Sequence, residues 1–164
     1  TYPLPEAQMD RFMMKVVITY PNKEEEKEIL RSRISPKSQT ISPVIKPQDI
    51  IHAREVVKEV YIDAKIENYI TDIVFASRFP QDYGLSKLKP LIAYGASPRA
   101  TINLALASRA LAFIRRRGYV IPEDVRAVCL DVIRNRIGLT YEAEAENIKS
   151  EDIATEIINK IDVP

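Results

Sequence analysis

The chain has 164 residues, which is long enough to bury a hydrophobic core and corresponds to one domain, or to one domain and part of a second. Its 24 Lys and Arg residues nearly balance its 23 Asp and Glu residues, which excludes strong long-range attraction to nucleic acid or to an anionic membrane. The single Cys129 excludes an intramolecular disulfide, and no apolar stretch approaches the roughly 20 residues that span a bilayer. We therefore expect a cytoplasmic protein without membrane insertion.

The N-terminal part of the chain predicts a short α/β segment. Residues 6–10 indicate one helical turn, and residues 12–20 are typical of a strand because they are apolar on both faces. The following residues offer no clear partner for this strand, so we expect its partners upstream of Thr1. Residues 23–33 predict a charged helix whose first turn holds glutamates, where the helix dipole favours anions.

A stretch rich in proline and small polar residues, residues 35–47, is typical of a domain boundary. We place residues 1–44 in one domain and residues 45–164 in a second domain that should be all-helical. The second domain begins with two helices, predicted from helical spacing of apolar residues and expected to pack together. These helices cover residues 48–60 and 63–79.

The next predicted elements are a loop and a central helix. Residues 80–96 predict a long loop, which leads into a helix over residues 98–117. That helix is apolar on most of its surface and should lie at the centre of the domain. Gly118 is predicted to end it, and we interpret the three arginines before Gly118 as a favourable helix terminus rather than a nucleic-acid patch.

The C-terminal part predicts two more amphipathic helices, over residues 122–136 and 150–161. Between them, residues 141–146 alternate with period two and could form either an extended segment or a short helix. The carboxylates there have no His at ligand spacing, and the lone His52 has no ligand cluster, so we predict no metal site. Cys129 lies in an apolar helical run and is interpreted as a buried structural thiol.

The start of the 98–117 helix carries the strongest local signal in the sequence. Ser97 can cap the helix by accepting a hydrogen bond from a free backbone N–H, and Pro98 suits the first helical position because it has no N–H to leave unpaired. Arg99 then falls in the first turn, where the helix dipole disfavours a cation. A negative group should therefore lie near Arg99.

Two partners for Arg99 fit the residues. A ligand phosphate would receive the free N–H groups together with the guanidinium, whereas a carboxylate from a neighbouring helix would form an ordinary ion pair. Arg11, at the junction of the predicted helical turn and strand, is a second arginine suited to phosphate. The sequence has no Gly-rich phosphate loop, no H-E-x-x-H motif and no Cys-x-x-Cys pair, so these arginines indicate half a phosphate site rather than a complete active site.

Segments along nearly the whole chain resemble, in the same order, the MoxR family of AAA+ ATPases. The resemblance is carried by TYPLPEAQMDRF at residues 1–12, YP at 20–21, GASPRA at 95–100, PEDVR at 122–126 and RIGLTY at 136–141. It implies that the Walker A loop, the Walker B acidic residues and the first sensor lie upstream of Thr1. The expected fold is then mainly α: a helical AAA+ lid over residues 45–164, preceded by the last strand and helix of a truncated α/β ATPase core over residues 1–44.

The same resemblance implies roles for both arginines. Arg11 would be the arginine finger, which acts in trans on the ATP of a neighbouring subunit, and Arg99 would be the second sensor, which contacts the phosphates of ATP in its own subunit. The parent protein would use ATP and Mg, form a ring with a hexamer as the expected size, and act as a chaperone-like motor in the maturation or metal-centre assembly of client proteins. The chain alone should neither hydrolyse ATP nor bind it tightly.

A competing hypothesis is an autonomous helical module that binds a protein or nucleic-acid partner without nucleotide. Its nucleic-acid form would require a salt-dependent affinity for DNA or RNA, and the near-zero net charge argues against that form.

Overall fold

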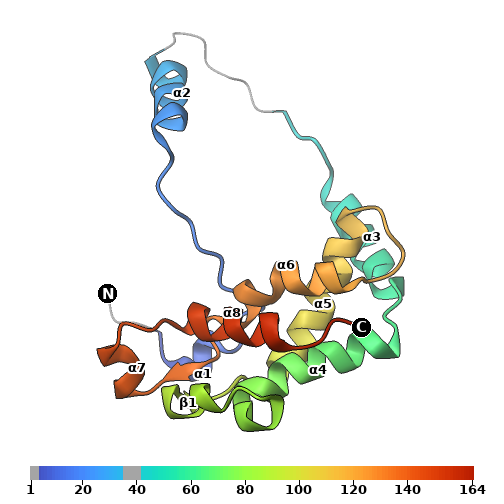
Figure 1. Ribbon diagram of the computed structural model, residues 1–164. Coiled ribbons are helices and arrows are strands. Elements are labelled where there is room, and N and C mark those ends of the chain that lie inside the picture. The colour runs from blue at the N-terminus through green and yellow to red at the C-terminus, as the bar shows by residue number, and fades with distance from the viewer. Residues whose placement is uncertain (1–3, 35–41) are drawn as a thin grey trace.

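The computed structural model describes residues 4–34 and 42–164, and its architecture is mainly helical, as predicted (Figure 1). The α-helices of the described residues are α1 (Glu6–Met9), α2 (Lys23–Ile34), α3 (Pro47–Glu59), α4 (Ala64–Arg78), α5 (Pro98–Ile114), α6 (Pro122–Ile133), α7 (Tyr141–Ala145) and α8 (Ser150–Lys160). The remaining elements of these residues are the short 3-10 helices η1 (Pro80–Tyr83) and η2 (Ser86–Leu91) and the strands β1 (Ile92–Tyr94) and β2 (Gly138–Leu139). None of the described helices has both the length and the apolar character needed to cross a bilayer.

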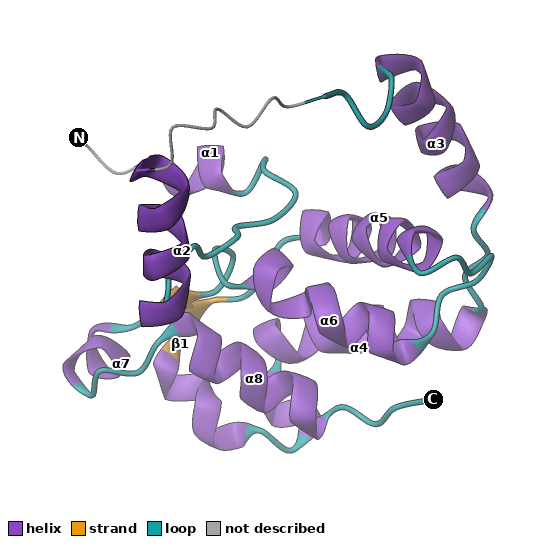
Figure 2. Ribbon diagram, turned by 90° about the horizontal axis from the view of Figure 1, so that it is seen from above, coloured by secondary structure: helices purple, strands orange, loops and turns teal. Residues whose placement is uncertain are grey.

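The hydrophobic core lies between α4, α5, α6 and α8 (Figure 2). α5 packs most extensively against α6 and also contacts α4, while α8 contacts both α4 and α6. The largest fully buried apolar side chains come from all four helices: Ile70, Ile73, Val74, Leu104, Val125, Val132, Ile133, Ile153 and Ile157. The central position predicted for α5 is therefore confirmed, because its apolar surface meets helices on more than one side.

α3 is bound to the bundle differently from the sequence prediction. It has no buried residue, and its main helical contact is with α5 rather than with α4. The backbone just after α3 is held instead by Tyr61, whose N–H donates to the Gly118 carbonyl at 2.9 Å and whose carbonyl accepts from the Val120 N–H at 3.0 Å. The apolar spacing in α3 identified a helix but not the partner of that helix.

Residues 80–96 are more ordered than the predicted long loop. η1 and η2 occupy most of the segment, and β1 then pairs antiparallel with β2, with Ile92 opposite Leu139 and Tyr94 opposite Gly138. β2 could not be recognised in the sequence because it has only two residues. This small sheet delivers the chain to the start of α5.

Two further sequence interpretations are settled by the structure. Residues 141–145 form the short helix α7, which Thr140 caps by accepting the Ala143 N–H at 3.3 Å, so the helical alternative is correct. Cys129 is fully buried, and burial raises the pKa of its thiol to about 12, which agrees with a structural rather than a reactive cysteine.

The strand predicted over residues 12–20 is not formed. Its second half is exposed, with Ile18 91% and Tyr20 96% accessible, and the segment contacts the bundle through the Lys15 N–H, which donates to the Asp131 carbonyl at 2.7 Å. A strand requires a neighbouring strand for its backbone groups, and none of the described residues supplies one. Figure 1 shows α2, which follows this segment, standing away from the other helices.

The C-terminal end of α5 is fixed by a buried carboxylate. Arg116, with φ of 58°, takes the left-handed conformation that ends the helix, so the prediction that Gly118 does this is wrong. Asp124 at the start of α6 is fully buried and accepts from Arg115 at 3.0 Å, from Arg117 at 2.6 Å and from the Ile121 N–H at 3.1 Å. Arg115 and Arg117 therefore join α5 to α6, in addition to the predicted place of the basic triplet at a helix terminus.

Candidate phosphate-binding site

The start of α5 has the structure that the sequence predicts. The Ser97 hydroxyl oxygen accepts the Arg99 N–H at 3.2 Å, and Pro98 takes the first helical position. Ala96, the residue before Ser97, is held by two hydrogen bonds to the end of α4. Its N–H donates to Ser77 Oγ at 2.9 Å, and its carbonyl accepts from Arg78 Nε at 2.6 Å. The helix terminus that carries Arg99 is therefore rigidly placed.

Gly95 is required for this placement. A Cβ atom at Gly95 would lie 2.4 Å from the Ser77 carbonyl oxygen, a backbone atom that cannot move independently of α4. We expect Gly95→Ala to displace the start of α5 and to lower the free energy of unfolding by about 1–3 kcal/mol, the usual cost of overpacking. Gly118→Ala is the matched control, because a Cβ at Gly118 meets no atom within 4 Å. Urea unfolding should separate the two variants; equal stabilities would show that this close approach is unimportant.

Arg99 is paired with a carboxylate, the simpler of the two partners considered from the sequence. Its Nη1 donates to Asp10 Oδ2 at 3.0 Å, and the side chains are 55% and 20% exposed, respectively. The Ser97 hydroxyl also donates to the carboxylate of Asp10, at 2.9 Å to Oδ1. The cation in the first turn is thus neutralised by a residue at the end of α1, far away in sequence.

Arg136, which sequence reasoning did not select, completes the group around Asp10. Its side chain is 0% exposed, and its Nε donates to Asp10 Oδ1 at 3.1 Å. A signal was available, because Arg136 continues the apolar stripe of α6 through Val125, Cys129 and Val132 at spacings of four, three and four. A charge on an apolar stripe is buried and needs partners.

The electrostatics of the group favour an ionised Asp10. Burial alone would raise the pKa of Asp10, but hydrogen bonds from Arg99 and Ser97 and the charge of Arg136 hold that pKa below its usual value. Burial lowers the pKa of Arg136, and the nearby carboxylate of Asp10 partly offsets this effect. Asp10 is therefore a carboxylate with competing cationic partners, of which Arg99 is much the more exposed.

Arg11 is exposed and follows Asp10 directly. Its N–H donates to the Gln8 carbonyl at 3.2 Å, so its backbone belongs to the turn that ends α1. Among the residues that the structure describes, Arg11 forms no salt bridge. Of the two arginines singled out from the sequence, Arg99 thus binds the Asp10 carboxylate, whereas Arg11 adjoins Asp10 only as the next residue in the chain.

The Arg99–Asp10 pair can give way to a stronger anion. Exposed ion pairs contribute about 0–1 kcal/mol, whereas a phosphate carries more charge and can use the capped helix terminus as well. A small pocket of about 190 Å³ lies beside the pair; its lining includes the carboxylates of Glu6 and Asp10 as well as Ser97 and Arg136, but not Arg99. A phosphate at Arg99 would therefore have to displace the carboxylate of Asp10.

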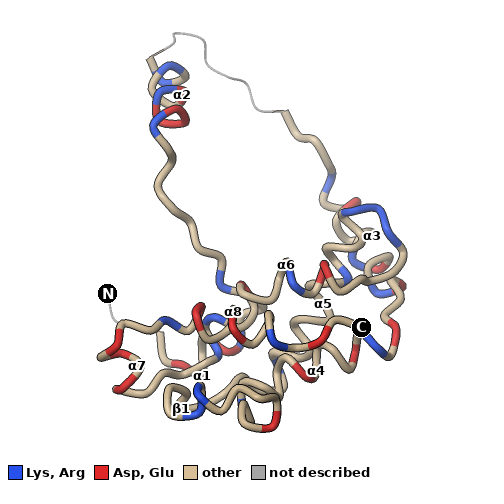
Figure 3. Tube along the Cα trace, viewed as in Figure 1, with Lys and Arg blue, Asp and Glu red and all other residues tan. Residues whose placement is uncertain are grey.

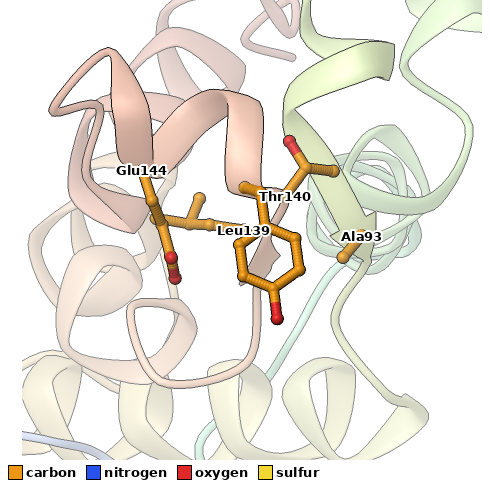
Figure 4. Close-up of a pocket in the computed structure, with 5 residues that line it drawn as sticks. Ala93, Leu139, Thr140 and Glu144 are labelled. Atoms are coloured by element: carbon orange, nitrogen blue, oxygen red, sulfur yellow. The ribbon is translucent and has the colours of Figure 1, made fainter.

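A second pocket, of about 400 Å³, offers no comparable chemistry (Figure 4). It lies beside the β1–β2 pair and is lined by Ala93, Leu139, Thr140, Tyr141 and Glu144. Its only charged lining group is a carboxylate, which repels phosphate. Elsewhere, acidic and basic positions are spread over the described part of the chain, and its longest basic run is the triplet at 115–117, too short for a nucleic-acid groove (Figure 3).

Comparison with known proteins gives a consistent result. The AAA lid domain family model matches residues 86–157. The chain is 38% identical to "Chaperone MoxR1" of Mycobacterium tuberculosis over 164 residues, which cover 99% of this chain and 43% of that protein. It is 32% identical to "Protein MoxR" of Paracoccus denitrificans over 159 residues, which cover 89% of this chain and 47% of that protein.

The fold is also similar to a solved structure. The crystal structure of a Cytophaga hutchinsonii protein described as an ATPase superimposes with a TM-score of 0.95 at 43% identity, over 99% of this chain and 50% of that chain. The chain thus spans about half the length of the relatives that it matches.

Proposed function

This chain belongs to the MoxR family of AAA+ ATPases, and we propose that it supplies the helical lid and the arginine finger of a longer, ring-forming ATPase. Residues 45–164 are the lid, and residues 1–44 are the edge of the α/β core. The Walker A loop, the Walker B residues and the first sensor belong to a preceding part of the same protein. The match of the AAA lid model to residues 86–157 supports this division.

One observation carries the proposal. The most exposed cation of the group around Asp10 is Arg99, which lies in the first turn of a Ser97-capped helix and is held by an ion pair that is 55% exposed on the arginine side. A cation at this end of a helix is unfavourable unless an anion is bound there. We interpret Asp10 as the partner of Arg99 when no phosphate occupies the site.

The proposed roles follow from charge and position. ATP with its Mg ion supplies the phosphoryl group and the developing negative charge. Arg99 neutralises phosphate charge in its own subunit, and because it lies on α5 it transmits nucleotide binding to the lid. Arg11 lies outside the bundle and acts across the subunit interface, where a guanidinium stabilises the transition state of phosphoryl transfer.

The remaining parts of the proposal concern the whole protein. It forms a ring of identical subunits, with a hexamer as the expected size, and works in the cytoplasm as a chaperone-like motor for the maturation or metal-centre assembly of client proteins. The printed name "Chaperone MoxR1" of the Mycobacterium tuberculosis relative supports the chaperone assignment.

ATP affinity tests the role of Arg99. In the full-length protein, Arg99→Ala should weaken ATP binding about 10- to 100-fold, the usual contribution of a charge-assisted hydrogen bond. Titration calorimetry in the presence of Mg measures this change. Arg54→Ala on the exposed side of α3 is the control and should bind ATP normally. If both variants bound ATP equally well, Arg99 would not be a phosphate ligand.

A further inference from the structure

Arg136 is the most deeply buried arginine of the described residues that takes part in an ion pair, with 0% of its side chain exposed. A buried guanidinium is costly unless its N–H groups are hydrogen-bonded and its charge is balanced. The hydrogen-bond partners of Arg136 therefore indicate its role.

Three of these partners are backbone carbonyls around Arg11, and the others are the Asp10 carboxylate, the Val132 carbonyl and the Asn135 side chain. Arg136 Nη2 donates to the Asp10 carbonyl at 3.0 Å and also to the Phe12 carbonyl, and its Nη1 lies 3.4 Å from the Met13 carbonyl. Arg11 is the residue between the first two of these carbonyls. The planar guanidinium binds this backbone through Nη2 while its Nε binds the Asp10 carboxylate, whereas a lysine has one nitrogen for all of these contacts.

Neighbouring residues extend the same contact. Asn135 Nδ2 donates to the Met9 carbonyl at 3.1 Å, and the Asp131 carbonyl accepts the Lys15 N–H at 2.7 Å. Residues 9–15 therefore run along the end of α6, held by hydrogen bonds to their backbone. The side chain of Arg11 is left exposed within a fixed stretch of backbone.

We propose that Arg136 is a positioning residue for Arg11: it fixes the backbone on both sides of the arginine finger to the turn that follows the lid helix α6. This inference rests on the proposed function, because it requires Arg11 to act as a finger. Asp10 then connects the sensor Arg99 with the finger Arg11. Its carboxylate binds Arg99 and Arg136, and its carbonyl, which directly precedes Arg11, binds Arg136. A movement of the lid with nucleotide in one subunit thereby moves the finger that this subunit offers to its neighbour.

The proposal is tested first by steady-state kinetics of the full-length ATPase. Arg136→Lys keeps the charge, but its single nitrogen cannot replace Nε at the Asp10 carboxylate, Nη1 near the Met13 carbonyl and Nη2 at the other two carbonyls together. We therefore expect kcat to fall about 10- to 100-fold, as for a catalytic group displaced by about 1 Å. The KM for ATP should change little, because the finger belongs to a neighbour's site. Arg134→Lys is the matched control, because Arg134 is also nearly buried but pairs with Asp131 and Glu151 and leaves residues 9–13 untouched.

Mixed rings separate positioning of the finger from general damage to the lid. An Arg99→Ala subunit keeps its finger but lacks a sensor, so it should restore activity to Arg136→Lys subunits, whose own sites are intact. Arg11→Ala subunits should not restore it, because neither partner then offers a working finger. Rescue by Arg11→Ala subunits, or by neither partner, would overturn the assignment of Arg136.

Two additions keep the test decisive. Should Arg136→Lys fail to assemble, Asn135→Ala removes one carbonyl contact of the same segment from a half-buried position and is judged by the same pattern of rescue. Arg11→Ala and Arg99→Ala are also mixed with each other. If these two failed to complement, the proposed function itself would fall, independently of Arg136.

Discussion

Arg11→Ala is expected to lower the kcat of the full-length ATPase about a thousandfold, the lower end of the effect of arginine fingers in phosphoryl transfer. The finger stabilises charge that develops in the transition state, so the KM for ATP should remain close to that of the wild type. Steady-state ATP hydrolysis of assembled protein measures both constants. Arg11→Lys should also be strongly impaired, because an ammonium lacks the planar fork of the guanidinium.

The control for this experiment is Arg31→Ala, which removes an exposed arginine from α2 and should leave kcat unchanged. A kcat of Arg11→Ala similar to that of the control would show that the finger is another residue.

Asp124→Asn is expected to cause a large loss of stability in the bundle. Asp124 is fully buried between Arg115 and Arg117, and removing its charge leaves two guanidinium groups without their counter-ion. Because both arginines retain some contact with solvent, we expect a loss of about 2–3 kcal/mol, below the range for fully buried pairs. Equilibrium urea unfolding measures this change. Glu55→Gln, which breaks an exposed pair with Lys58, should leave the stability almost unchanged.

The pH dependence of stability gives an independent check on Asp124. Burial acts to raise its pKa, but the hydrogen bonds from Arg117 and the Ile121 N–H prevail and hold the pKa below the ordinary value of 3.8. The stabilisation is therefore fully present above that ordinary value and is lost as the pH falls through the lower pKa of the folded state. The difference in stability between the wild type and Asp124→Asn should shrink as acid is added. A difference that stayed constant below pH ~4 would argue against an ionised Asp124.

The helices of the bundle could be predicted from sequence because local signals agree with tertiary packing. α5 illustrates this: Ser97 and Pro98 specify its start, and its apolar surface specifies its central place. The strand over residues 12–20 could not be judged in the same way. Its apolar residues indicate that burial of the segment is favourable. A strand also needs a neighbouring strand for its backbone hydrogen bonds, and the described residues contain none for this segment.

The candidate site was only partly predictable for a similar reason. Arg99 stands out because its conflict with the helix dipole is local in sequence. Its partner Asp10 lies 89 positions away, and Arg136 lies 126 positions from Asp10, so no periodicity or spacing connects them. Arg136 lies at the helical spacing that continues the apolar stripe of α6, which indicates that it is buried. Only the three-dimensional structure shows which carbonyls it binds.

The division of labour between the two arginines is the central claim, and rings mixed from Arg11→Ala and Arg99→Ala subunits test it most directly. At ATP concentrations below the KM of the wild type, each variant alone should hydrolyse ATP much more slowly than the wild type, Arg11→Ala through kcat and Arg99→Ala through weak ATP binding. In the mixture, Arg99→Ala subunits offer intact fingers to the intact nucleotide sites of Arg11→Ala subunits, so ATP hydrolysis should rise well above that of either variant alone. If activity stayed at the level of the separate variants at every mixing ratio, the assignment of Arg11 in trans and Arg99 in cis would be contradicted.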